Sequence, residues 1–253
     1  MTTDTLTPRQ STPMSRVLAV VKLHFANPWT ILTLPWMILG IIFAANIVIW
    51  LLIRAAASPE GAASASEGMQ WSGAGLYIFV YMMVVAVQAI SITFPFALGF
   101  GVTRRDFYLG SALTFVGLSA MYSIGLAILA EIEVATNGWG LGGTMFAPVY
   151  FGEGFFAHLF IFFVTNLLFF FVGSMFASIW VRWKANGLVL GLVGLGALIL
   201  AGITLLTLTD SWPAFGEFFA RAGFVGSYAW SLVLTALAGI TGFFILRRAT
   251  PKS

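Results

Sequence analysis

Residues 155–181 read FFAHLFIFFVTNLLFFFVGSMFASIWV, and this stretch decides the fold class. It holds nine Phe and no Asp, Glu, Lys or Arg. A helix that crosses the hydrocarbon core of a bilayer, about 30 Å thick, needs roughly 20 predominantly apolar residues. The stretch is therefore predicted to be a membrane-spanning helix.

The same pattern recurs along the chain, so an all-α, polytopic membrane protein with six transmembrane helices is predicted. The predicted spans are approximately residues 31–53, 76–100, 107–130, 155–181, 188–208 and 228–246. Residues 1–14, rich in Thr, Ser and Pro, are expected to form a disordered cytoplasmic tail. Residues 15–253 are expected to form a single transmembrane domain.

The composition of the 253 residues excludes an ordinary soluble fold. Apolar residues make up 60% of the chain and charged residues only 8%, against roughly 25% charged residues in an average soluble domain. The mean hydropathy of +0.97 agrees. Cys is absent, which excludes disulfides, thiolate metal sites and a catalytic thiol.

The basic residues fall mainly on one side of the predicted membrane, in a split of 10 to 2. The ten are Arg9, Arg16, Lys22, Arg104, Arg105, Arg182, Lys184, Arg247, Arg248 and Lys252, and the two are Arg54 and Arg221. Because cytoplasmic loops collect Lys and Arg, both termini are predicted to be cytoplasmic. The net charge of +3 forms no continuous basic stripe, so no nucleic-acid partner is expected.

A short amphipathic helix on the inner membrane surface is predicted at Ser15 to Asn27, before the first span. Its apolar face carries Val17, Leu18, Val21 and Phe25, and Ser15, Arg16, Lys22 and Asn27 lie away from that face. Pro28 then turns the chain into the bilayer, because the residue before a proline avoids the α region. The alternative is a plain extension of the first span; in either case membrane lipid is an expected partner.

The sequence lacks the motifs of a phosphate-binding loop and of a zinc protease. None of the three lysines follows a Gly, as the phosphate-binding loop of an ATPase requires. His24 and His158 lie on different segments without the Glu of a zinc protease, and each is interpreted as an interfacial polar residue. No catalytic residue, metal or cofactor is therefore expected.

The predicted spans contain few polar groups, and none is charged near the middle of a span. Gln88 and Asn166 are interpreted as packing residues that bond to other helices, with a role in lining a substrate path as the alternative. Glu131 and Glu133 are expected at the outer end of the third span, where water reaches them. Pro95 is expected to distort the end of the second span.

The most unusual cluster is the turn after the second span, GFGVTRRDFYLG at residues 99–110. Its glycines permit a sharp turn, and Asp106 is expected to cap the next helix. Arg104 and Arg105 serve as topology anchors in the simplest interpretation. A compact, charged cytoplasmic turn would also suit binding by a soluble subunit that drives movement of the membrane helices.

With these features the chain resembles the permease subunits of type-2 ABC exporters, as found in bacterial drug, bacteriocin and lantibiotic export or immunity systems. The resemblance rests on the lead-in helix, the six spans with both ends inside, the stretch from Gly101 to Phe107 and the lack of a nucleotide site. The stretch Val102 to Gly110 is similar to one in small permeases of actinobacteria.

The resemblance implies a bacterial plasma-membrane protein that forms a homodimer, or a heterodimer with a second permease, bound by separate cytoplasmic ATP-binding-cassette ATPase subunits. The contact with the ATPase would be made by Thr103, Arg104, Arg105, Asp106 and Phe107. The lead-in helix would transmit motion through Arg16, Val17, Val21, Lys22 and Phe25. The segment Asp210 to Gly226 would be either a re-entrant hairpin or a surface loop.

Two other functions remain open at this point. An accessory membrane protein, such as an immunity or scaffold subunit, would bind a partner without pumping. A secondary carrier is disfavoured by the lack of charges inside the spans and of a visible inverted repeat.

Overall fold

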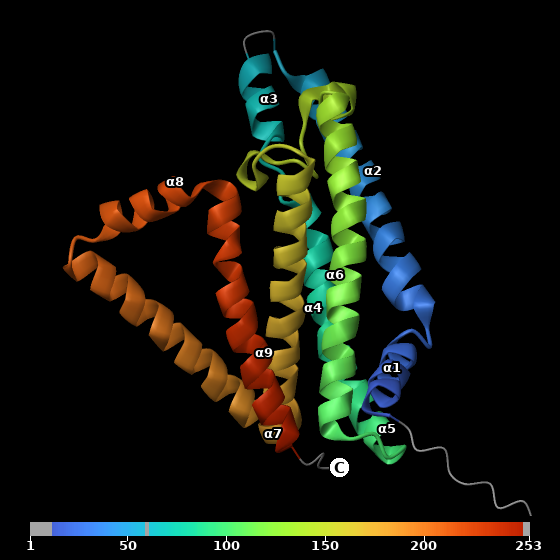
Figure 1. Ribbon diagram of the computed structural model, residues 1–253. Helices are drawn as coiled ribbons and strands as arrows, with labels where there is room; N and C mark the ends of the chain where they lie inside the picture. The colour runs from blue at the N-terminus through green and yellow to red at the C-terminus, as the bar shows by residue number, and fades with distance from the viewer. Residues whose placement is uncertain (1–11, 59–60, 250–253) are drawn as a thin grey trace, which may run out of the picture.

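A computed structural model of the chain describes residues 12–58 and 61–249, and these residues form helices and turns with no strand (Figure 1). The α-helices are α1 (Pro13–His24), α2 (Leu34–Ala56), α3 (Ala62–Met69), α4 (Tyr77–Gln88), α5 (Phe94–Gly99), α6 (Arg104–Ala135), α7 (Phe155–Leu208), α8 (Trp212–Ala229) and α9 (Ser231–Arg247). The π-helical turns are η1 (Trp29–Thr33), η3 (Ala89–Thr93) and η4 (Gly138–Gly142), and the 3-10 turns are η2 (Ala74–Leu76) and η5 (Val149–Phe151). The all-α prediction is confirmed.

Five helical segments of the described chain are long and apolar enough to cross a membrane. They are Trp29–Ala56, Glu67–Gly99, Arg104–Ala135, Phe155–Leu208 and Trp212–Arg247. The fourth has 54 residues and contains two of the six predicted spans. Its helix is interrupted at Lys184, whose φ of 56° and ψ of −148° are not helical.

The core lies between α2, α4, α6, α9 and the first part of α7 (residues 155–183), which stand side by side in Figure 1. Its largest side chains are aromatic: the rings of Phe115 and Phe170 stack with centroids 4.8 Å apart, and Trp36 stacks on Tyr122 at 5.2 Å. Small residues permit the close approach, since a Cβ atom on Gly125 would lie 2.5 Å from the Trp36 ring. Aromatic burial of this kind is a large favourable packing contribution.

Beyond Lys184 the chain leaves this bundle. Residues 185–208 and α8 form what we call the arm (residues 185–229), which Figure 1 shows leading away from the bundle and back to it. No residue of the arm is buried, and Leu190 and Leu198 are 72% and 70% exposed. Residues 185–208 carry no charged side chain, so their exposure reflects how the helices pack and not a polar sequence.

Two π-helical turns precede prolines in matching positions. η1 is followed by Pro35, and η3 by Pro95, so the predicted distortion near Pro95 is confirmed. A proline lacks an N–H and frees a carbonyl one turn earlier, which must find another donor inside a membrane. At η1 the donor is the Tyr122 hydroxyl, 2.6 Å from the oxygen of Ile31.

The segments outside the bundle differ from the predictions in detail. α1 begins at Pro13, two residues inside the predicted tail, because Thr12 caps it by accepting a bond from the Ser15 N–H at 3.3 Å. Residues 1–11 of that tail lie outside the described residues. α3 was not among the predicted helices. The segment 210–226 is largely helical, with α8 kinked at Gly223.

Candidate functional site

One end of the molecule brings together segments that are far apart in sequence. Figure 1 shows α1, the turn between α5 and α6, the bend of α7 and the end of α9 at this same end. Eight of the ten basic residues assigned to one side lie in these segments: Arg16, Lys22, Arg104, Arg105, Arg182, Lys184, Arg247 and Arg248. The other two, Arg9 and Lys252, lie outside the described residues.

The turn between α5 and α6 is held by its own backbone. The N–H groups of Phe100, Gly101 and Val102 donate to carbonyls of the last turn of α5 at 3.0–3.2 Å. Gly101 has a φ of 79°, a left-handed conformation that glycine adopts without steric cost. The turn is therefore compact.

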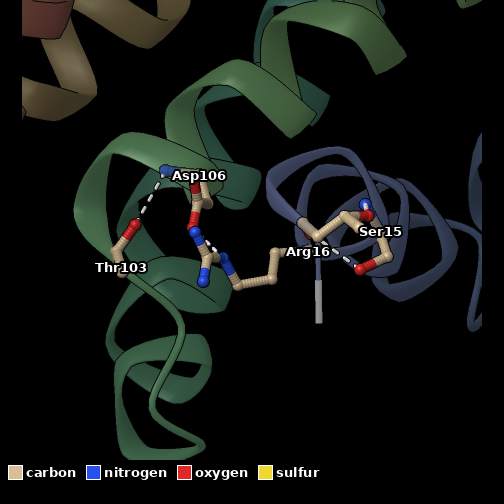
Figure 2. A network of polar contacts seen from close by, with 5 residues as sticks. Ser15, Arg16, Thr103 and Asp106 are labelled. Atoms are coloured by element: carbon tan, nitrogen blue, oxygen red, sulfur yellow. Dashed lines mark hydrogen bonds and ion pairs between the residues drawn. The ribbon is translucent and has the colours of Figure 1, made fainter. Parts of the chain in front are cut away.

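The first turn of α6 is capped by a different residue from the one predicted. The Thr103 hydroxyl accepts a bond from the Asp106 N–H at 3.1 Å, so Thr103 is the N-cap. The Asp106 carboxylate instead faces α1, where its Oδ2 lies 2.8 Å from Nε of Arg16 (Figure 2). The side chain of Asp106 is 8% exposed and that of Arg16 45% exposed. This ion pair joins two helices about 90 residues apart in sequence.

α1 packs against α6 at a position without a side chain. Val20 is buried, and a Cβ atom on Gly110 would lie 2.5 Å from its Cβ. Nearby, Nε2 of His24 lies 2.8 Å from Oγ of Ser111. Burial lowers the pKa of His24 to about 4, because the charged ring would lose its hydration. His24 is thus half-buried against α6, and its predicted place at the membrane interface stays a prediction.

The residues predicted to contact an ATPase differ in their exposure to solvent. Thr103 and Arg105 are exposed, and Arg104 is half-buried and donates to the carbonyl of Arg247 at 3.2 Å. Asp106 and Phe107 are buried, so they offer no surface to a partner. Phe107 instead packs on Phe94, with ring centroids 5.2 Å apart. For these two residues the predicted direct contact is corrected to an internal role.

The face of α1 that packs on the bundle is rotated by part of a turn from the predicted one. Val17, Val21 and Phe25 are half-buried, and Lys22 is exposed as expected. Leu18, placed on the apolar face from the sequence, is 46% exposed. The face that meets the bundle is instead centred on Val20, because the glycine at position 110 accepts a side chain there.

The two polar residues proposed for a substrate path are not brought together. Gln88 lines a cavity of about 360 Å³ between α1, η3 and α6, together with His24 and Thr114. Asn166 does not line this cavity; it is fully buried in α7 and donates to the carbonyl of Phe162 at 3.1 Å.

At the opposite end of the bundle the structure contains a feature that the sequence analysis missed. Glu133 was expected at a wet interface, but it is 1% exposed. Its carboxylate accepts bonds from the backbone N–H groups of Met145, Phe146 and Ala147 at 2.8–3.0 Å and from the Trp139 indole at 3.0 Å. The glycine-rich run at residues 138–143 is the one sequence signal for this tight loop.

A histidine also lies at this end in an unexpected environment. His158 is 1% exposed, and its Nδ1 lies 3.2 Å from Oε1 of Glu131. Its predicted place at the membrane interface stays a prediction. Across residues 12–58 and 61–249, no group of three or more His, Asp or Glu side chains is placed to hold a metal ion. Comparisons with protein-family models, with curated proteins and with solved structures find no match to the chain.

Proposed function

We propose that the chain is the membrane-spanning permease subunit of an ATP-driven exporter in the bacterial plasma membrane. In this proposal it crosses the membrane six times with both termini in the cytoplasm, and α7 crosses twice about the bend at Lys184. α1 lies along the inner surface of the membrane. The basic end of the molecule then faces the cytoplasm, in agreement with the distribution of Lys and Arg.

The observation that carries the proposal is the ion pair between Arg16 and Asp106. It fastens the lead-in helix to the first turn of α6, directly behind the exposed Thr103 and Arg105. A partner that presses on this turn would move the start of α6 and, through the ion pair, α1. A contact of this kind biases a two-state bundle only if it differs between the states.

ATP hydrolysis is assigned to a separate cytoplasmic subunit, because the sequence holds no phosphate-binding loop. Two permease chains, identical or different, would face each other and bind two such ATPases. Phe107 is buried and packs on Phe94 with ring centroids 5.2 Å apart, which supports the turn from inside the bundle.

The first test is to purify the tagged full chain in mild detergent from its native host and to identify stoichiometric partners by mass spectrometry. A soluble ATPase supports the proposal. A chain that repeatedly purifies without a nucleotide-binding partner overturns it in favour of an accessory membrane protein or a carrier.

The second test reverses one exposed charge on the turn. Arg105→Glu should lower the partner's stimulated ATPase activity by about tenfold or more, because a reversed charge at an interface opposes association. Arg248→Glu is the matched control, since Arg248 is exposed at the same end but outside the turn. Equal activity of both variants with normal coupling would contradict the assignment of the turn.

A further inference from the structure

A groove of about 440 Å³ lies between the first part of α7 and α9. Its walls are apolar apart from Thr241, and Leu195 of the arm contributes to them. Both helices belong to segments long enough to span a membrane, so lipid chains reach the groove. Apolar walls accept many hydrophobic bodies. The occupant is therefore inferred from the charges that lie beyond the end of the groove.

On both helices, the face that lines the groove continues to an arginine at the basic end of the molecule. On α7, Met175 lines the groove and Arg182 follows seven residues later. On α9, Thr241 lines the groove and Arg248 follows at the same interval. Seven residues are close to two full turns, so residues at this spacing lie on the same side of a helix. Both arginines therefore lie beyond the same end of the groove.

The helix ends that carry the two arginines pack on each other. Val181 and Leu246 are buried in one hydrophobic cluster, and Figure 1 shows the bend of α7 beside the end of α9. The guanidinium of Arg182 lies over the Trp183 ring, 4.4 Å from its centroid, where the negative face of the ring attracts the cation. Arg248 is exposed. Two cationic groups are thus available at adjoining helix ends.

The positive charge of these groups is not neutralised by nearby acids. Among the acidic residues of the described ranges, Asp106 alone lies in the segments of this end, and it faces α1. Trp180 and Trp183, which are 41% and 46% exposed, flank this part of α7, and tryptophan favours the headgroup level of a membrane. Basic pockets between transmembrane helices bind anionic lipid heads. A guanidinium suits this role because it matches a phosphate with two parallel hydrogen bonds.

The length of the groove together with the arginines fits one leaflet of a bilayer. Leu168 is a groove residue of α7, and the fourteen residues from it to Arg182 span about 21 Å at 1.5 Å per residue. A bilayer measures roughly 40–45 Å with its headgroups, so one leaflet measures about 20–22 Å. A lipid with its phosphate at the arginines therefore places a hydrocarbon chain along the groove.

We infer that the groove and the two arginines form one binding site for an anionic phospholipid of the surrounding bilayer. The guanidinium groups of Arg182 and Arg248 hold its phosphate, and one hydrocarbon chain lies in the groove between the bundle and the arm. We call this the lipid site. The inference goes beyond the proposed function, because it requires a membrane but neither a bound ATPase nor a particular orientation of the chain.

The test measures equilibrium binding of tritiated dioleoylphosphatidylglycerol to the delipidated full chain in dodecyl maltoside micelles. Tritiated dioleoylphosphatidylcholine is measured separately, since it has the same hydrocarbon chains but no net charge. We expect one saturable site per chain for phosphatidylglycerol and binding of phosphatidylcholine that is weaker by about tenfold or more. Equal affinities for the two lipids would show that the groove accepts any lipid, and would overturn the inference.

Two variants remove the charges that hold the phosphate. Arg182→Gln and Arg248→Gln should each weaken phosphatidylglycerol binding about tenfold, the low end of the range for a hydrogen bond to a charged group. Arg105→Gln is the matched control, because Arg105 is exposed at the same end but lies outside the lipid site. It should leave the affinity within twofold. Equal losses in all three variants would mean that binding follows the net charge of this end, and would overturn the inference.

A further pair of variants tests the groove. Leu237→Trp fills it from a position that is 57% exposed, so the bundle should still fold, and phosphatidylglycerol binding should fall about tenfold. Leu232→Trp adds the same ring at an exposed position of α9 outside the groove and should leave the affinity within twofold. Unchanged binding in Leu237→Trp would contradict the site. Size-exclusion chromatography identifies any variant that fails to fold, and the remaining variants then decide.

The lipid site and the proposed function fail separately. The lipid measurement contains no ATPase, so a negative result there leaves the permease proposal unchanged. The ATPase measurement with Arg248→Glu as its control is made without anionic lipid, so the lipid site has no ligand in it. A negative result in that measurement leaves the lipid site unchanged.

Discussion

The two ends of the bundle are each organised around a buried carboxylate, and the two carboxylates are held differently. Glu133 takes its partners from the next fourteen residues of its own loop, and three of them are backbone N–H groups. Asp106 takes its partner from a separate helix, and that partner, Arg16, is 45% exposed in its side chain. One carboxylate is held by its own loop, whereas the other is held between two helices by a partner that solvent reaches, beside the packing of Val20 on Gly110 and the contact of His24 with Ser111.

This comparison indicates where the molecule can change shape. A carboxylate bonded by backbone groups of one loop is released only if the loop unfolds. An ion pair between two helices, with one partner half in solvent, contributes little to stability and separates at small cost. Motion is therefore expected at the α1 end, where the proposed partner binds, and not at the Glu133 end.

The largest expected effect comes from breaking the fixed end. Glu133→Gln replaces an acceptor of several N–H bonds with an amide whose NH₂ group opposes one of them. Because hydrogen bonds to a charged group are strong, the free energy of unfolding should fall by about 3 kcal/mol. Thermal unfolding in detergent measures the loss, with Glu131→Gln as the control, since Glu131 is 40% exposed in its side chain. Equal losses in the two variants would contradict the special role of Glu133.

The second prediction concerns pH at the α1 end. Released from α6, the His24 ring would take up a proton with its ordinary pKa of 6.5, whereas burial lowers the pKa in the docked state to about 4. Protons therefore favour the undocked state, and docking of α1 should weaken as the pH falls from 6.5 toward 4. At pH 5 the loss should be about 1–2 kcal/mol.

A spin label on one introduced Cys measures this docking. Because the chain has no Cys of its own, no other position is labelled. A label at Leu18→Cys should become more mobile between pH 6.5 and pH 5, and His24→Gln should remove most of the change. A label at Val149→Cys, in the loop at the Glu133 end, serves as the reference. Equal mobility changes at both labels would show that the two ends do not differ in this way.

The smallest expected effect comes from the ion pair itself. Arg16→Gln should cost about 1 kcal/mol or less, because the Arg16 side chain is 45% exposed and solvent partly screens the pair. The label at Leu18→Cys should nevertheless gain mobility at pH 7. Asp106→Asn combined with Arg16→Gln should cost less than the sum of the single changes, as coupled residues do. Strict additivity would mean that the pair does not act as a unit.

Much of the fold could be predicted because hydropathy is a local property. Each predicted span falls on helical residues almost throughout, and Pro95 marks a real distortion. The bend at Lys184 and the sparse packing along the arm are not local, since they depend on which helices meet. The same hydropathy describes the buried Phe170 and the exposed Leu198.

The candidate site was predictable as a turn but not as a set of contacts. The run from Gly99 to Thr103 indicates a tight turn before a helix, and the structure contains one. The pairing of Asp106 with Arg16 joins residues ninety positions apart, and no pattern in a single sequence specifies it. Glu131 and Glu133 are alike in sequence, yet only the loop that folds over Glu133 makes it a buried acceptor.

The bend of α7 lies at a single residue, Lys184. Its φ of 56° is rare for residues other than glycine. The helix beyond it runs 24 residues to Leu208, a length of about 36 Å at the usual rise per residue. A rotation of about 10° at this residue would carry the far tip of the helix some 6 Å sideways. Because the arm rejoins the bundle through α8, the width of the gap between arm and bundle depends on this residue together with the kink at Gly223.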